Sequence, residues 1–433
     1  MATRDDRHNY LIFLLDGGFF MGAMTFVNLQ TLLPAMILDQ GGPSWLAAMV
    51  PSSMILGVFG LPIFTAAWID SLPRLLPVLA LFGGLQRLYY LAAGVLLLIP
   101  GFGDKHLIWI ASLTPLLAGL TIGVAITAFQ RLYIRCIPAR MRASNVAYRF
   151  LLGGLMGIAA GRVIEELLTA YPPAEAMAYL HFLAFVLMAG SWWFLIRVRE
   201  PEPEAPAEVP LGKTGLADIT DCVKDLFAAG PRRRSMIAFA SGLMLMHTFF
   251  LPLPFFAKHL QTSINAPIAF LGVLAMWQMI GNASGNLMSA WVGDRFGGRL
   301  TMAFGAFCVG LCLLVAPFIG GRVGVCIVYG LFALGVMVLV VGKDALMFDL
   351  GPKKRQARFL AVVALLTMVS LLVVSVGSYL LWELTGSFAV LSWTGSAGAF
   401  LCFACISNVS EPRTDVHENP LGKLRRGVLR AFR

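Results

Sequence analysis

The sequence predicts an all-α membrane protein that crosses the bilayer twelve times, in two halves of six helices each. Of the 433 residues, 58% are hydrophobic and 13% are charged. An ordinary soluble domain is roughly one-quarter charged, and so apolar a chain cannot cover itself with polar surface. Apolar runs of about twenty residues, long enough to span hydrocarbon as a helix, recur between short polar segments.

These runs are bounded by charged residues or by proline and glycine. The first follows the polar start Met1–Asn9 and is too long for the core of a cleaved signal peptide, so we expect it to be retained. Six crossings precede a longer polar segment and six follow it. The expected ranges are 10–36, 44–68, 75–99, 107–131, 147–169, 176–196, 235–257, 266–292, 300–320, 323–342, 359–382 and 387–407.

The polar segment between the halves predicts a linker and not a folded domain. It opens with alternating glutamate and proline and closes with three arginines, and such a composition cannot bury a core. Residues 216–227 have helical apolar spacing that suits the membrane surface. We expect an N-terminal six-helix bundle at 1–196, a cytoplasmic linker at 197–234, a C-terminal six-helix bundle at 235–407 and a basic cytoplasmic tail at 408–433.

The basic residues predict the orientation. With Met1 inside, four of the 33 lysines and arginines fall on the outer side. Because cytoplasmic loops carry the excess of basic residues, we expect a multi-pass cell-membrane protein, of the bacterial inner-membrane type, with both termini cytoplasmic. The net charge of +10 is spread between apolar runs and does not indicate nucleic acid, and the basic tail suits either anionic lipid or water. The outer residues are Lys105, Arg162, Lys258 and Arg322.

Two loops at matching places in the halves are alike. The loop after the second crossing reads AAWIDSLPR, and the loop after the eighth reads AWVGDRFGGR. Their aspartates, Asp70 and Asp294, are 224 positions apart, and a Pro-Ala-Arg after the fourth crossing is echoed 214 positions later by Pro-Lys-Lys. This spacing indicates duplicated halves, as in many secondary transporters.

Through these loops the chain resembles the major facilitator superfamily over essentially its whole length. That family carries G-x-x-x-D-R-x-G-R-R between its second and third helices, often echoed between the eighth and ninth. Here Ala290 replaces the leading glycine of the second copy and Gly298 replaces one basic residue. The matching residues are Asp294, Arg295, Gly297 and Arg299 in the second loop, and Asp70 and Arg74 in the first.

The resemblance implies twelve helices in two bundles, alternating access, and loops that latch the cytoplasmic side. Gly297 allows a tight turn, and the charged residues offer partners to neighbouring helices. The alternative for both loops is a basic segment that only sets topology. Drug–proton antiporters of the family often carry an arginine in helix four and Gly-Pro in helix five. Both are absent here, so multidrug efflux is not expected.

The resemblance also implies a central cavity lined by crossings 1, 2, 4, 5, 7, 8, 10 and 11. Gln278, Asn282 and Asn286 recur every fourth residue on one face of the eighth crossing, and Asn28 lies deep in the first. Amides are costly against lipid, so we expect these four side chains, with His247, to line the cavity. Hydrogen bonding between helices is the alternative for the three amides of the eighth crossing.

Four residues are candidates for carrying a coupling proton: Asp16, Glu165, Glu166 and His247. Asp16 lies inside the first crossing and either has a coupling or substrate role or pairs locally as a structural residue. His247 lies near the middle of the seventh crossing, where it is either a proton carrier or a neutral packing residue. Glu165 and Glu166 follow Arg162 at i+3 and i+4, so the three either form an outer gate or simply pair with each other.

Two further groups of charges have structural and functional interpretations. Arg87 lies near the midplane of the third crossing, which is peripheral in the family, so we expect it to pair with an acid on a neighbouring helix, with substrate binding as the alternative. Charged residues at the inner ends of crossings four and ten predict an inner gate, with ordinary flanking charges as the alternative. These residues are Gln130, Arg131, Lys343 and Asp344.

The chain has no phosphate-binding loop G-x-x-x-x-G-K-[ST], so we do not expect ATP to drive it. The sequence predicts a secondary transporter of a small solute, coupled to protons or another ion, surrounded by membrane lipids and monomeric. No cofactor, metal or nucleic acid is expected. The alternatives on the same fold are a flippase for lipids or amphiphiles and a non-transporting membrane chaperone or receptor. A membrane enzyme is disfavoured because no catalytic motif is present.

Overall fold

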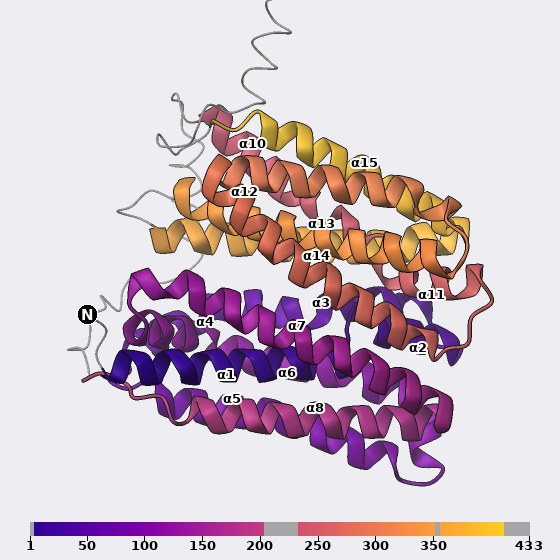
Figure 1. Ribbon diagram of the computed structural model, residues 1–433, viewed down its shortest axis with the longest axis horizontal. Coiled ribbons are helices and arrows are strands. Elements are labelled where there is room, and N and C mark those ends of the chain that lie inside the picture. The colour runs from indigo at the N-terminus through magenta and orange to yellow at the C-terminus, as the bar shows by residue number, and fades with distance from the viewer. Residues whose placement is uncertain (1–3, 203–232, 351–355, 411–433) are drawn as a thin grey trace, which may run out of the picture.

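The computed structural model describes residues 4–202, 233–350 and 356–410, and the regular structure in these ranges is helical. Figure 1 shows two bundles of nearly parallel helices lying side by side, one from each half of the chain. Most of the expected linker, including residues 216–227, and most of the basic tail lie outside the described residues.

The first bundle follows the six expected crossings of the N-terminal half. Its helices are α1 (Arg4–Phe26), α2 (Leu32–Asp39), α3 (Ser44–Gly60), α4 (Pro62–Asp70), α5 (Leu76–Leu97), α6 (Phe102–Cys136), α7 (Ala139–Ala170) and α8 (Pro173–Leu195).

The second bundle follows the six expected crossings of the C-terminal half. Its elements are α10 (Arg233–Met246), the 3₁₀ turn η1 (His247–Phe250), α11 (Leu253–Ser263), α12 (Phe270–Val315), the 3₁₀ turn η2 (Ala316–Phe318), α13 (Arg322–Leu350), α14 (Gln356–Thr385) and α15 (Phe388–Ser407).

Within the described ranges, nine helical stretches are long and apolar enough to cross a membrane. The second expected crossing is divided between α3 and α4, the fifth lies in α7, and the eighth forms the first part of α12. These three are helical, and the last two carry several polar side chains. The all-α multi-pass architecture is confirmed, while the number of twelve crossings stays a prediction.

The loop between the eighth and ninth expected crossings is a sharp bend inside α12. Gly297 has φ 80° and ψ 170°, a conformation that is essentially restricted to glycine. The helix resumes directly after it, and the Thr301 hydroxyl donates to the Gly297 carbonyl at 2.9 Å. Gly297 therefore sets the angle between the two helical segments that form α12.

The first and seventh expected crossings are broken at corresponding places, which the hydropathy pattern did not predict. Between α1 and α2, the Asn28 side-chain oxygen accepts from the backbone N–H groups of Gln30 and Thr31 at 2.9 and 3.0 Å. Such local bonds compete with the helical ladder. Between α10 and α11, η1 is followed by Pro252, which lacks a backbone donor. Broken helices in matching positions often mark a transporter's binding site.

We call the side on which α1 begins the inner side, following the orientation predicted from the charges. In Figure 1 the ribbons of the two bundles meet on the other side, around α2 and α11, and diverge towards the inner side. On the outer side Lys258 pairs with Asp39 at 2.6 Å, and Ser44 bonds Glu383. The bundles are thus joined on the outer side in this state.

Candidate functional site

The break in the first crossing is bound to the opposite bundle by hydrogen-bonded side chains, which we call the clasp: Asn28, Gln30, Thr31, Gln278 and Tyr329. Gln278 of α12 is its centre. Its amide oxygen accepts from Asn28 at 2.7 Å and from Thr31 at 2.6 Å, and its amide nitrogen donates to Gln30 at 2.6 Å. The Thr31 hydroxyl also lies 2.7 Å from that of Tyr329 in α13.

The direction of the two hydroxyl bonds in the clasp can be assigned. Thr31 gives its hydroxyl proton to Gln278, so Tyr329 must donate to Thr31. The side-chain oxygen of Asn28 accepts from the backbone N–H groups of Gln30 and Thr31. Asn28, Thr31, Gln278 and Tyr329 are nearly inaccessible, at 0 to 5% exposure. Buried polar groups are stable only when paired, so the clasp holds the bundles in one register.

The three amides of α12 have different surroundings in this state. Gln278 is bonded between helices, which is the alternative that the sequence left open. Asn286 donates to the carbonyl of Asn282 on its own helix at 3.0 Å, and both residues are half-buried. Lining of a solute cavity by Asn28, Asn282 and Asn286 stays a prediction.

His247 begins the break in the seventh crossing and is 5% exposed. Its Nδ1 lies 3.1 Å from the hydroxyl of Ser370 in α14, and that hydroxyl donates to the Met244 carbonyl at 2.8 Å. Because the Ser370 proton is engaged, Nδ1–H is the donor in the histidine contact. The imidazole therefore ties α14 to α10 inside the second bundle, and its role in proton coupling remains a prediction.

Asp16 and Arg87 lie together in the interior of the first bundle. Ser191 of α8 donates to the Asp16 carboxylate at 2.7 Å and accepts from Arg87 at 2.8 Å. The guanidinium and carboxylate are 4.0 Å apart, and both side chains are 6% exposed. Arg87 also donates to the carbonyls of Met188 and Gly83 at 2.6 and 2.7 Å. One buried network thus joins α1, α5 and α8.

Arg162, Glu165 and Glu166 form a local cluster near the outer end of α7. The arginine pairs with Glu165 at 2.8 Å and with Glu166 at 3.0 Å. Arg162 and Glu166 are more than 60% exposed, so their charges are solvated and largely satisfied within one helix.

In the described part of the structure the residues of the predicted inner gate make the following contacts, and the gate itself stays a prediction. Lys343 pairs with its neighbour Asp344 at 2.7 Å, Arg131 donates to the Ile69 carbonyl at 3.1 Å, and Gln130 is exposed. In the second loop Arg295 lies over the Trp291 ring at 5.3 Å, and Arg299 donates to the Val409 carbonyl at 2.8 Å. The side chains of Asp70 and Asp294 lie outside the described part of the structure.

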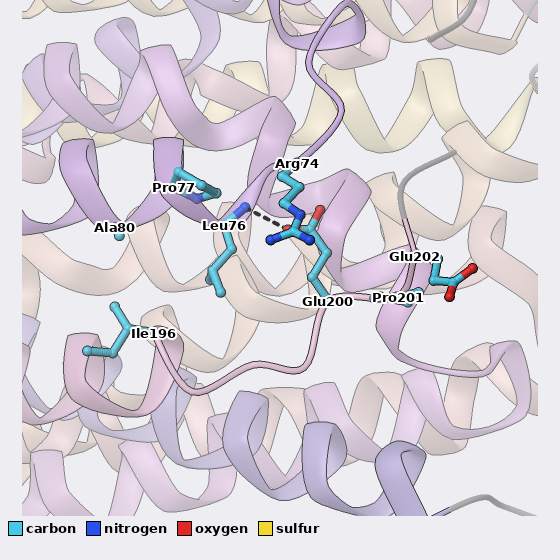
Figure 2. Close-up of a pocket in the computed structure, with 8 residues that line it drawn as sticks. All are labelled: Arg74, Leu76, Pro77, Ala80, Ile196, Glu200, Pro201 and Glu202. Carbon is cyan, nitrogen blue, oxygen red and sulfur yellow. Dashed lines mark hydrogen bonds between the residues drawn. The ribbon is translucent and has the colours of Figure 1, made fainter. Parts of the chain in front are cut away.

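The chain that follows α8 contacts the inner end of the first bundle, where α5 begins. Glu200 accepts from the backbone N–H groups of Leu75 and Leu76, at 2.9 and 3.1 Å, where α5 begins. Its carboxylate lies 3.4 Å from Arg135. Figure 2 shows Glu200 beside Arg74 in a cavity of about 500 Å³. A carboxylate at a helix N-terminus is stabilising, so Glu200 fixes this segment under the bundle.

Sequence reasoning missed several residues that the structure brings into these sites, including Gln30 of the clasp and Ser191 between Asp16 and Arg87. Thr31 and Tyr329 belong to the clasp, Ser370 orients His247, and Arg149 of α7 approaches α1. Hydroxyl groups are common in apolar helices and carry no distinctive spacing. Arg149 falls near the inner end of the fifth expected crossing, where it resembles an ordinary flanking charge.

The fold is shared with several solved transporters. A mutant of the nucleoside transporter NupG is 13% identical, with a TM-score of 0.68, over 93% of this chain and 100% of that one. A POT family transporter in complex with a thioalcohol-conjugated peptide is 12% identical, with a TM-score of 0.67, over 91% and 94%. A single-residue variant of the E. coli fucose:proton symporter FucP is 13% identical, with a TM-score of 0.60, over 94% and 100%.

No curated protein matches the chain. The family model described as Major Facilitator Superfamily matches residues 91–338, more than half of the sequence and parts of both bundles. The chain belongs to the Major Facilitator Superfamily.

Proposed function

We propose that this protein is a secondary active transporter that moves a small solute by alternating access, with a proton gradient as its energy source. The observation that carries the proposal is the clasp: uncharged side chains join the bundles on the outer side while the bundles diverge on the inner side. This arrangement corresponds to one of the two states that rocking of two halves around a central site requires.

The clasp suits a contact that must open and close repeatedly. A hydrogen bond between neutral groups contributes a net of about 1 kcal/mol, because water replaces the lost partner when the contact opens. When the bundles part on the outer side, Gln278 and Asn28 lose each other and turn to water or to solute. The residues that close the outer side in one state would then meet the solute in the other.

Proton coupling is best supported at Asp16. Its carboxylate is buried and shares Ser191 with Arg87, so protonation would change the charge balance among α1, α5 and α8. Glu165 and Glu166 are solvated and paired with Arg162, and His247 is bonded within its own bundle. We therefore rank Asp16 first and His247 second.

We further propose that both termini are cytoplasmic and that the protein works as a monomer in the bacterial inner membrane.

A transport assay on reconstituted vesicles tests this proposal. Proteoliposomes are incubated with a metabolite mixture, with and without an imposed proton gradient, and the internal solutes are identified by mass spectrometry. We expect gradient-dependent accumulation of at least one solute. Fluorescent phospholipid added to the same vesicles provides the flippase control. Lipid translocation without solute movement, or no movement of either, would contradict the proposal.

A disulfide across the bundles provides the mechanistic arm of the assay. The seven native cysteines are first replaced. Ser52→Cys with Ser375→Cys then links α3 to α14 across the bundles, where the two hydroxyls are 2.7 Å apart. Ser235→Cys with Ser410→Cys links two segments of the second bundle whose hydroxyls are 2.9 Å apart. Oxidation of the first pair should stop transport until the disulfide is reduced, whereas the second pair should leave transport intact.

A further inference from the structure

A cation with unused hydrogen-bond donors lies in the first bundle, apart from the clasp. The guanidinium carbon of Arg149 lies 5.5 Å from the centroid of the Phe129 ring and 5.8 Å from that of Tyr133, both on α6. Its third neighbour is Gly17 of α1, where a Cβ would come within 2.5 Å of the guanidinium carbon. Two aromatic rings and a bare stretch of backbone therefore form a slot around the guanidinium.

The five N–H donors of Arg149 make no hydrogen bond or ion pair with the residues that the structure describes. Two other arginines of this bundle, Arg87 and Arg142, are different. Arg87 donates to two carbonyls and a serine, and Arg142, two turns earlier on α7, donates to the carbonyls of Ile137 and Ile134 at 2.9 and 2.8 Å. Arg149 is half-buried, so its donors need acceptors from water or a ligand.

The charge of Arg149 has an acidic neighbour in Asp16. Asp16, the residue before Gly17, interacts with it electrostatically, but its carboxylate is bonded to Ser191. A guanidinium matches carboxylate and phosphate groups through two parallel N–H···O bonds. The slot thus combines a free planar donor, an apolar lining and a nearby negative charge that would keep anion binding reversible.

We infer that Arg149 binds the anionic group of the transported solute, so that the solute class is a small carboxylate or phosphate ester. This inference rests on the proposed transport function, since it places the solute at the inner side of the first bundle. Gly17 is then a positioning residue, because any side chain there would occupy the space of the guanidinium. Asp16, which precedes Gly17, connects this site to Ser191 and Arg87.

The test uses benzoate, phenyl phosphate and the neutral benzamide as probes of equal ring size. Purified protein in nanodiscs is treated with phenylglyoxal, which modifies free guanidinium groups, and each arginine is followed by peptide mass spectrometry. We expect Arg149 to be modified at least about tenfold faster than Arg142, whose donors are engaged. Benzoate or phenyl phosphate should slow this modification, and benzamide should not. Protection by one anion and not the other identifies the carboxylate or phosphate class.

Variants give a second readout by thermal unfolding. Benzoate or phenyl phosphate should raise the Tm of the wild type and of Arg142→Gln, but not that of Arg149→Gln. Arg149→Lys keeps the charge without the planar fork and should bind about tenfold more weakly. If Arg149→Gln does not fold, anion binding by Arg149→Lys and the modification rates still test whether Arg149 binds the anion. Equal anion effects in Arg149→Gln and the wild type, or an unreactive Arg149, would overturn the inference.

Because these measurements record binding, they are independent of the vesicle assay. Anion binding at Arg149 without solute movement would contradict the transport function and leave the site standing. Transport of a neutral solute that is unaffected by Arg149→Gln would contradict the site and leave the transport function standing.

Discussion

The Asn28 amide donates to the Gln278 side-chain oxygen at 2.7 Å, and this bond joins the break in the first crossing to α12 of the opposite bundle. The two residues are 250 positions apart and each is 5% exposed. Around them Thr31, Tyr329 and Gln30 complete the network. The contact between bundles is therefore polar and specific at its centre.

Removing the centre of the clasp should loosen the outer side. Gln278→Leu leaves Asn28 and Thr31 without a buried acceptor, which costs about 1–3 kcal/mol per stranded group. We expect a lower Tm and faster thiol labelling of Thr31→Cys in a cysteine-free background. Asn286→Leu is the matched control, since that amide bonds only to its own helix. Equal labelling in the two variants would contradict this role of Gln278.

The buried network of the first bundle should be strongly coupled. Arg87→Met leaves the Asp16 carboxylate with one cation fewer in a buried site, a loss of about 3–5 kcal/mol for such pairs. Arg87→Met combined with Asp16→Asn removes both charges and should be less destabilising than the sum of the single changes. Thermal unfolding of the four proteins in nanodiscs measures the coupling. Additive changes would show that the two side chains do not act as a pair.

The bend in α12 should depend on glycine. At the φ and ψ of Gly297, alanine is strained by about 1–3 kcal/mol. Gly293→Ala is the matched control on the same helix, since a Cβ there would meet its nearest side-chain atom at 3.6 Å, an ordinary contact. We expect a lower Tm for Gly297→Ala than for Gly293→Ala. The reverse order would show that this conformation is not required.

The segment after α8 should contribute to the stability of the first bundle. Glu200→Gln removes the charge from two backbone N–H bonds and from the Arg135 contact, so we expect a loss of about 1–2 kcal/mol. Glu202 lies two residues later with an exposed side chain, and Glu202→Gln should leave the Tm unchanged. Equal Tm values for the two variants would remove Glu200 from this role.

Composition and the spacing of apolar runs were sufficient for the fold. Each expected crossing coincides with helix because hydropathy reports which segments lipid can surround. The breaks at Asn28 and His247 were not predicted, because they arise from a local side-chain bond and from prolines inside runs that remain apolar. Gly297 was predicted as a turn because its loop matched a family pattern.

The sites were harder to predict because their partners come from distant parts of the chain. The periodic amides of α12 indicated a polar face. The partners of Gln278, however, are Asn28 and Thr31 of the other bundle, and the sequence does not show that they meet. The sequence of α7 alone did not mark Arg149 as a site residue, because its surroundings are formed by α1 and α6. A sequence shows which side chains are costly in lipid, whereas the structure shows which of them remain without partners.

Distances between spin labels, measured by double electron–electron resonance, test the central claim of alternating access most directly. One label pair, Glu175→Cys and Thr262→Cys, spans the outer side, and another, Ser71→Cys and Ser410→Cys, spans the inner side, both at exposed positions. We expect two populations in each pair, with the outer distance lengthening as the inner one shortens, and with Gln278→Leu favouring the outward-open population. Single distances that the variant leaves unchanged on both sides would contradict the account.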